Sequence, residues 1–168
     1  MQLILLSFFF AAFLAWLFPF GKMPPIINDV ATDLEDPPQF VKAEIGPLPE
    51  RFKAIIKEHY PDLKPAVFAE HERGRVFDAV VKTVQEQPRW SVTYQDAASG
   101  VLEGVAVTRV MRFRDDFVIR VRDHPQGGSV VDMRSRSRLG KGDMGANAER
   151  IRIFLKALSE TLPQLKAT

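Results

Sequence analysis

Hydrophobic and polar positions alternate over four stretches in the second half of the chain, which is typical of half-buried antiparallel strands. In one of them Phe117, Ile119 and Val121 share a face, while Arg120 and Arg122 share the other. We predict strands over residues 89–95, 101–113, 117–122 and 129–138.

Helical spacing appears on both sides of these strands. Val76, Val80 and Val84 recur along residues 73–88, and Pro88 ends that helix. Residues 144–162 carry a longer apolar stripe, which predicts a C-terminal helix. Residues 51–63 are expected to form a short helix that ends at Pro61, and residues 66–70 alternate weakly, as a short strand would.

The predicted order is strand, helix, four strands, helix, which indicates an α+β domain. We expect an antiparallel sheet of four to five strands with helices packed on one face. This order resembles the TATA-box-binding-protein-like arrangement and its helix-grip relatives, an analogy that does not fix function.

The first residues have a different character. No residue from Gln2 to Gly21 is charged, and the 18-residue run from Leu3 to Phe20 is at the lower limit of what can cross a hydrocarbon layer of roughly 30 Å as a helix. Bulky residues stand where a signal peptidase needs small ones. We therefore expect an uncleaved transmembrane helix over residues 1–21, with lipids as partners. The flanking charges favour neither orientation strongly, and we place the domain outside the cytoplasm, in the periplasm, leaving the reverse open.

Residues 22–50 are rich in proline and acidic residues, so we interpret them as an extended arm or linker before a single domain over residues 51–168. The segment is either a flexible spacer or an ordered arm. In the second case Ile26, Ile27, Leu34 and Phe40 would lie on the domain surface.

Composition narrows the functional classes. The formal net charge is only +2, so no nucleic-acid partner is expected. The chain contains no cysteine, which excludes disulfides, thiolate metal sites and cysteine nucleophiles. Residues 109–152 are locally basic, with 11 basic and 6 acidic side chains, and almost all the basic ones are arginine. Arginine favours planar, bidentate partners, so this bias suits ordered ion pairs or a bound anion.

Residues 131–152 concentrate this chemistry. Arg134, Arg136 and Arg138 alternate with Ser135 and Ser137, so the arginines share one strand face. If Val131 and Met133 face the core, the arginines face outward, and Arg120 on the preceding strand adds to them. This surface either forms cross-strand ion pairs, each contributing about 0.2–1 kcal/mol, or binds an anion. The acids available for pairing include Asp132, Asp115, Asp116 and Glu149, although Asp115 and Asp116 fit turn positions better.

Glycines at 140, 142 and 145 match the spacing G-x-G-x-x-G. A dinucleotide site would need a parallel strand after the following helix, and the sequence leaves no room for one. The simpler role is the start of a helix, with Asp143 as the capping residue and Asn147 facing either the sheet or the end of the last strand.

No catalytic arrangement emerges. The three histidines lack metal-ligand spacing, and no G-x-S-x-G motif is present. We therefore predict no catalytic residue, metal or cofactor, and favour a binding domain for an anionic or amphiphilic small ligand or a protein partner. Its candidate ligand-binding residues are Arg120, Asp132, Arg134, Ser135, Ser137, Arg138, Asp143, Asn147 and Arg150. The alternatives are a hydrolase that uses Asp132, Ser135 or Asp143, and a purely structural Arg/Asp network.

The run FRDDFVIRV and the block D-x-R-S-x-S-R-x-G-x-x-D-x-G-x-N-x-x-R-I, together with Asn28-Asp29 and Thr32-Asp33, resemble a bacterial family, domain of unknown function family 1499. The likeness runs from about Asn28 to Leu158. It implies no particular reaction, ligand or cofactor.

Overall fold

The computed structural model describes residues 23–164, which form one antiparallel sheet, three α-helices and a short 3-10 helix. The elements are β1 (Asp29–Ala31), α2 (Glu50–His59), β2 (Ala66–Phe68), α3 (Arg73–Glu86), β3 (Trp90–Asp96), β4 (Val101–Val107), β5 (Arg114–Asp123), β6 (Ser129–Ser137), α4 (Ala146–Thr161) and the 3-10 helix Leu162–Gln164. The predicted α+β class and antiparallel sheet are confirmed.

The sheet has the strand order β1-β6-β5-β4-β3, and β2 also pairs with β6. Strands β1 and β2 pair with different parts of β6, so both lie along the same edge of that strand. The sheet thus has six strands rather than the four to five we predicted. The missed strand is β1, because three residues among prolines are too short to show an alternating pattern.

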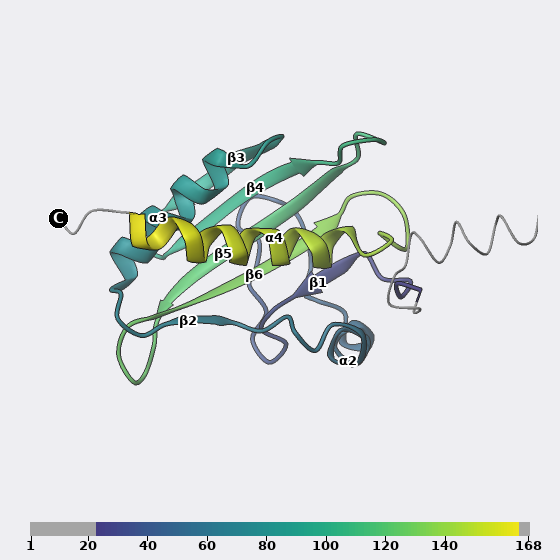
Figure 1. Cartoon of the computed structure of the whole chain (residues 1–168). Coiled ribbons are helices and arrows are strands. Elements are labelled where there is room, and N and C mark those ends of the chain that lie inside the picture. The colour runs from purple at the N-terminus through teal and green to yellow at the C-terminus, as the bar shows by residue number, and fades with distance from the viewer. Residues whose placement is uncertain (1–22, 165–168) are drawn as a thin grey trace, which may run out of the picture.

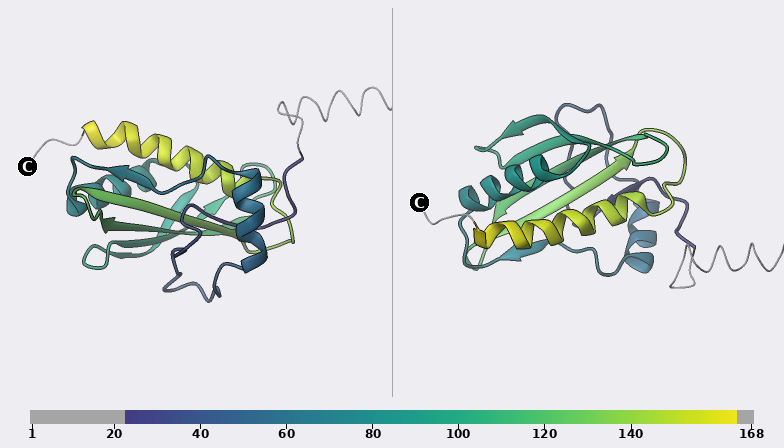
Figure 2. Two further views of the ribbon diagram at one scale, coloured as in Figure 1. Left: turned by 90° about the horizontal axis from the view of Figure 1, so that it is seen from below. Right: turned by 45° about the horizontal axis from the view of Figure 1, so that its top comes forward.

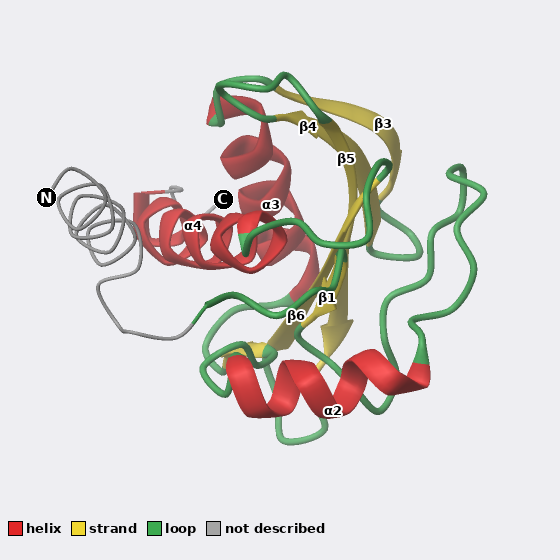
Figure 3. Ribbon diagram, turned by 90° about the vertical axis from the view of Figure 1, so that its right-hand side faces the viewer, coloured by secondary structure: helices red, strands yellow, loops and turns green. Residues whose placement is uncertain are grey.

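Helices α3 and α4 lie side by side on one face of the sheet (Figures 1 and 3). That face carries Phe117 and Ile119 from β5 and Met133 from β6, which pack with Ile151 and Phe154 of α4 in a single core. Val131 and Met133 thus face the core, which is the condition under which we expected the arginines of β6 to face outward. Helix α2 contacts β1 at the edge of the sheet instead (Figure 3).

Gly104 in β4 is required by close packing across this core. A side-chain Cβ at this position would lie 2.3 Å from Cζ of Phe117 and 2.6 Å from the carbonyl oxygen of Ser91. Real Cβ atoms essentially never come so close to other atoms, so only glycine at this position leaves room for the Phe117 ring.

One predicted strand is shorter in the structure than in the sequence-based prediction. We predicted a strand up to residue 113, but β4 ends at Val107, and Val110, Met111 and Phe113 lie exposed in the loop that follows.

Residues 23–50 pack against the domain, as expected for an ordered arm rather than a flexible spacer. Ile27, Val30 and Ala31 belong to the core, and the segment after β1 crosses the second face of the sheet before α2 (Figure 3).

The predicted membrane anchor over residues 1–21 lies outside the described residues. Within residues 23–164, no helix is both long enough and apolar enough to span a bilayer.

Candidate functional site

The face of the sheet opposite α3 and α4 is polar, and the arm, residues 32–49, covers part of it (Figure 3). Glu103 of β4 holds the arm there. Its side chain is buried, and its carboxylate accepts hydrogen bonds from the backbone N–H groups of Val41, Lys42 and Ala43. A buried carboxylate with several backbone donors is well satisfied, so this contact fixes the arm across the sheet.

Arg134 lies fully buried between β6 and the arm, with 0% of its surface exposed. Its guanidinium donates to both carboxylate oxygens of Asp29 at 3.0 and 2.8 Å. It also donates to the carbonyl oxygens of Gly46 at 2.8 Å and Pro38 at 3.4 Å, and it lies 5.2 Å from the centre of the Phe40 ring. These partners occupy the guanidinium, so Arg134 fastens the arm to the sheet.

Arg120 and Arg122 of β5 converge on Asp132 of β6, which is fully buried. The Asp132 carboxylate accepts from Nε of Arg122 at 2.9 Å and from a terminal nitrogen of Arg120 at 3.1 Å. The two arginines also pair with Asp33 and Asp36 of the arm. Burial raises the pKa of Asp132, and the two guanidinium groups act against that rise. These ion pairs form a second contact that holds the arm against the sheet.

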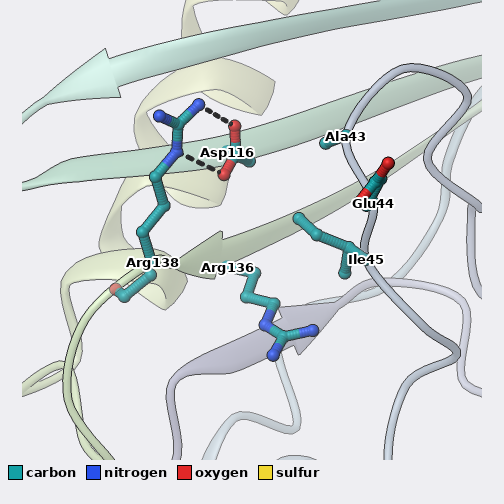
Figure 4. A pocket seen from close by; sticks show the side chains of 7 residues that line it. Ala43, Glu44, Ile45, Asp116, Arg136 and Arg138 are labelled. Atoms are coloured by element: carbon teal, nitrogen blue, oxygen red, sulfur yellow. Dashed lines mark hydrogen bonds and ion pairs between the residues drawn. The ribbon is translucent and has the colours of Figure 1, made fainter.

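The polar face opens where β6 ends, in a groove of about 330 Å³. Arg138 forms one side of it and is paired with Asp116 at 2.8 and 2.7 Å. Ala43 and Ile45 of the arm form the opposite side, with Glu44 at the exposed rim. Figure 4 shows Arg136 between these walls, with its guanidinium away from the Asp116–Arg138 pair. Within residues 23–164, the Arg136 side chain has no hydrogen bond or ion pair, so its charge is available.

Four of the sequence-predicted residues lie on the other side of the sheet, beneath α4. Arg150 pairs with Asp115 and donates to Ser135 at 2.8 Å. Asn147 accepts from Ser135 at 2.8 Å and donates to Ser137 at 3.0 Å. All these side chains are buried, and each forms a hydrogen bond or an ion pair with another member of the cluster. The cluster therefore joins β5, β6 and α4.

Asp143 lies in the loop between β6 and α4. Its carboxylate accepts from the backbone N–H groups of Gly145 and Asn147, both at 2.9 Å. Gly145 has a φ of 84°, the left-handed conformation that glycine adopts without strain. The N-cap residue of α4 is Gly145 rather than Asp143, which we predicted, but the Asp143 carboxylate still holds an amide of the first helical turn, and a ligand would have to displace it.

The nine candidate ligand-binding residues therefore do not form one site. Arg120, Asp132, Arg134 and Arg138 lie on the arm side of the sheet. The buried cluster beneath α4 holds Ser135, Ser137, Asn147 and Arg150, and Asp143 caps the helix. The predicted outward face of alternating arginines exists, but the arm covers Arg134 and leaves Arg136 open.

Sequence reasoning missed several of the residues that matter here. Asp115 and Asp116 are buried strand residues on opposite faces of β5, whereas we interpreted them as turn residues. Glu103 carried a usable signal, since a single acid in the apolar run VLEGVAV needs partners if it is buried. Arg136 belongs to the alternating pattern but is not one of the nine candidate residues, and nothing in the pattern shows that it differs from Arg134 in having no partner among the described residues.

The pKa of Tyr60, which lies near the loop before α4, provides a test of how strongly its hydroxyl is buried. Its hydroxyl is buried without a hydrogen-bond partner among the described residues. Burial raises the pKa of Tyr60 to about 12, with the charge of Asp143 adding to the rise and Arg152 opposing it. The unfolded chain ionises near its ordinary pKa of 10.0, so the free energy of unfolding should fall as pH rises from there towards 12.

We expect Tyr60→Phe to remove this part of the alkaline loss. Urea unfolding at about pH 8 and about pH 11 measures it, with Tyr94→Phe as the matched control because the chain has only these two tyrosines. An equally steep loss in Tyr60→Phe and wild type would contradict the assignment.

Among the described residues, no group of three or more His, Cys, Asp or Glu side chains is arranged to hold a metal ion.

Two solved structures are distantly similar to this chain. The crystal structure of TTHA0849 from Thermus thermophilus is 11% identical, with a TM-score of 0.36, and the match covers 61% of this chain and 97% of that one. The crystal structure of protein CV1439 from Chromobacterium violaceum is also 11% identical, with a TM-score of 0.31 and coverage of 60% and 93%. The curated proteins give no match.

A family model matches residues 29–158, from the start of β1 to three residues before the end of α4. The matched range includes the arm, the groove and the cluster beneath α4. This confirms the resemblance seen in the sequence: the chain belongs to DUF1499, a family of proteins of unknown function.

Proposed function

We propose that this protein is a membrane-anchored binding domain that holds a small anionic ligand in the groove between β6 and the arm. The observation that carries the proposal is Arg136, a guanidinium at the groove with no partner among residues 23–164. Its neighbours on the same face, Arg134 and Arg138, both have carboxylate partners. A cation without an internal partner, at a concave surface, is the natural place for an external anion.

The groove favours a ligand with both charge and apolar surface. The planar guanidinium of Arg136 matches a carboxylate through two parallel hydrogen bonds. Arg138 is about half exposed and adds positive charge, although Asp116 offsets much of it. The opposite wall carries the side chains of Ala43 and Ile45. A small amphiphilic carboxylate would place its charge at Arg136 and its hydrocarbon against Ile45 (Figure 4).

The remaining parts of the proposal come from the sequence. The uncharged run from Leu3 to Phe20 supports a single membrane-spanning anchor, with lipids as its partners. We place the domain outside the cytoplasm, in the periplasm, where it would meet ligands that enter from the surroundings. A protease-protection assay on intact cells and on inverted vesicles tests this orientation.

The hydrolase alternative has no geometric support. It requires Asp132, Ser135 or Asp143 to converge with arginines on one pocket. Asp132 lies beneath the arm, Ser135 lies beneath α4, and Asp143 holds the helix amides. The purely structural alternative describes the cluster beneath α4 well, but it leaves the open charge of Arg136 unexplained.

Hexanoate should raise the melting temperature of the wild-type chain, because a ligand that binds only the folded state stabilises it. Arg136→Ala should weaken hexanoate binding by about tenfold or more, since it removes a charge-assisted hydrogen-bonding group. Melting curves of the full chain in detergent, with increasing hexanoate, measure both effects.

Two controls sharpen this experiment. Hexanamide has the same size without the charge and should not stabilise the chain. Arg152→Ala removes an arginine of α4 that pairs with Asp62 far from the groove, and it should keep the hexanoate response. Equal stabilisation of wild type and Arg136→Ala by hexanoate would refute the proposal.

A further inference from the structure

Exposed apolar side chains gather at one end of the domain. Residue Ile26 precedes β1, the loop 108–113 carries Val110, Met111 and Phe113, and the loop 139–145 carries Leu139 and Met144. Val110 is 82% exposed and Ile26 is 80% exposed. We call this surface, formed by residues 23–26, 108–113 and 139–144, the terminal face. Soluble monomers rarely leave so many large apolar side chains together in water.

The three segments of the terminal face are neighbours in space. The side-chain amide of Asn28 donates to the carbonyl of Gly140 at 2.7 Å, and the N–H of Asp143 donates to the carbonyl of Ile27 at 3.0 Å. Strand β4 ends and β5 begins beside the end of β6, because the three strands are antiparallel neighbours. Figures 1 and 2 show both loops and the start of the described chain at the same end of the molecule.

The terminal face is also positively charged. Arg109, Arg112 and Lys141 are exposed and have no partner among the described residues, and Arg114 follows them at the start of β5. The segment 108–114 contains no acidic residue. Asp143, the one acid in the loop 139–145, has its carboxylate on the amides of α4. Apolar and basic side chains thus alternate over this surface without acids to neutralise them.

We propose that the terminal face lies on the surface of a bilayer that contains anionic phospholipids. Side chains such as Met111 and Phe113 enter the boundary between head groups and acyl chains, while Arg109, Arg112 and Lys141 contact the phosphates. The sequence points to this partner, because the uncharged run Leu3–Phe20 ends three residues before residue 23, which is part of the same face. This docking surface is distinct from the groove at Arg136 and extends the proposed function, sharing with it only the anchor.

The absence of cysteine allows a direct test on the full chain. Met111→Cys and Val67→Cys each introduce one exposed labelling site, at the terminal face and on β2, which pairs with the opposite end of β6. Each variant is labelled with an environment-sensitive fluorophore and reconstituted into nanodiscs of equal parts phosphatidylcholine and phosphatidylglycerol. Nitroxide groups on the acyl chains then report contact with the membrane interior by quenching.

The fluorophore at position 111 should be strongly quenched by acyl-chain nitroxides, and the one at position 67 should keep its unquenched intensity. Charge reversal by Arg109→Glu with Arg112→Glu should reduce the quenching at position 111, as should nanodiscs of phosphatidylcholine alone. Equal quenching at positions 111 and 67 would overturn the proposal, and quenching that is insensitive to lipid charge would overturn its electrostatic part. Neither failure would alter hexanoate binding, so the groove is judged separately.

Discussion

Arg134→Ala is expected to lower the free energy of unfolding by about 3–5 kcal/mol, the cost of breaking a buried ion pair by removing one partner. The substitution leaves the Asp29 carboxylate, which is 1% exposed, without its cation. It also removes the donor to the carbonyls of Gly46 and Pro38 and leaves a space beneath Phe40. Chemical denaturation of the full chain, followed by tryptophan fluorescence, measures the loss.

Arg136→Ala is the matched control for this prediction. It removes the same kind of side chain from the same face of the same strand, two residues further on, but breaks no internal ion pair among the described residues. We expect a change within about 0.5 kcal/mol, as for surface substitutions generally. If both substitutions lowered the free energy of unfolding by a similar amount, the buried contacts of Arg134 with Asp29 and the arm would not be the cause of the loss.

Arg150→Ala should cost a similar amount, about 3–5 kcal/mol, on the other side of the sheet. The substitution leaves Asp115 buried without its partner and removes the donor to Ser135 and Asn147. Because folded domains are typically stable by only about 5–15 kcal/mol, this variant can fail to accumulate. Arg150→Lys keeps the charge while losing the planar geometry, and it should show an intermediate loss of stability in urea unfolding.

Arg152→Ala, on the same helix, provides the comparison. Its partner Asp62 is about half exposed, and the Arg152 guanidinium holds the pKa of that carboxyl below its usual value. An exposed ion pair of this kind contributes about 0–1 kcal/mol. If Arg152→Ala proved as costly as Arg150→Ala, burial would not be the property that decides the strength of these pairs.

The sequence predicted those parts of the fold that are encoded in periodic patterns. The alternation of Val131 and Met133 with Asp132 and Arg134 identified both the strand and its core face, and the stripe around Ile151 identified the helix over it. The arm could not be predicted in the same way. Its path depends on long-range contacts, such as Arg134 with Asp29 and Glu103 with the amides of residues 41–43, which leave no local period in the sequence.

The nine candidate residues do not lie together in the structure. They are polar and lie on neighbouring stretches of the chain, yet a strand places adjacent residues on opposite faces. Ser135 and Asn147 thus became partners beneath α4, while Asp132 and Arg134 became the fastening of the arm. Only the three-dimensional pairing shows which of the three alternating arginines, Arg134, Arg136 and Arg138, has no carboxylate partner among the described residues, and this is Arg136.

A nitrogen-15 NMR titration of the arginine side chains, in the full chain and in zwitterionic micelles, tests directly whether Arg136 binds an anion. On addition of hexanoate, we expect a saturable shift of the Nε resonance of Arg136, no shift of the buried Arg134 resonance, and no response to hexanamide. An unchanged Arg136 resonance at hexanoate concentrations that stabilise the protein would show that hexanoate does not bind at this side chain.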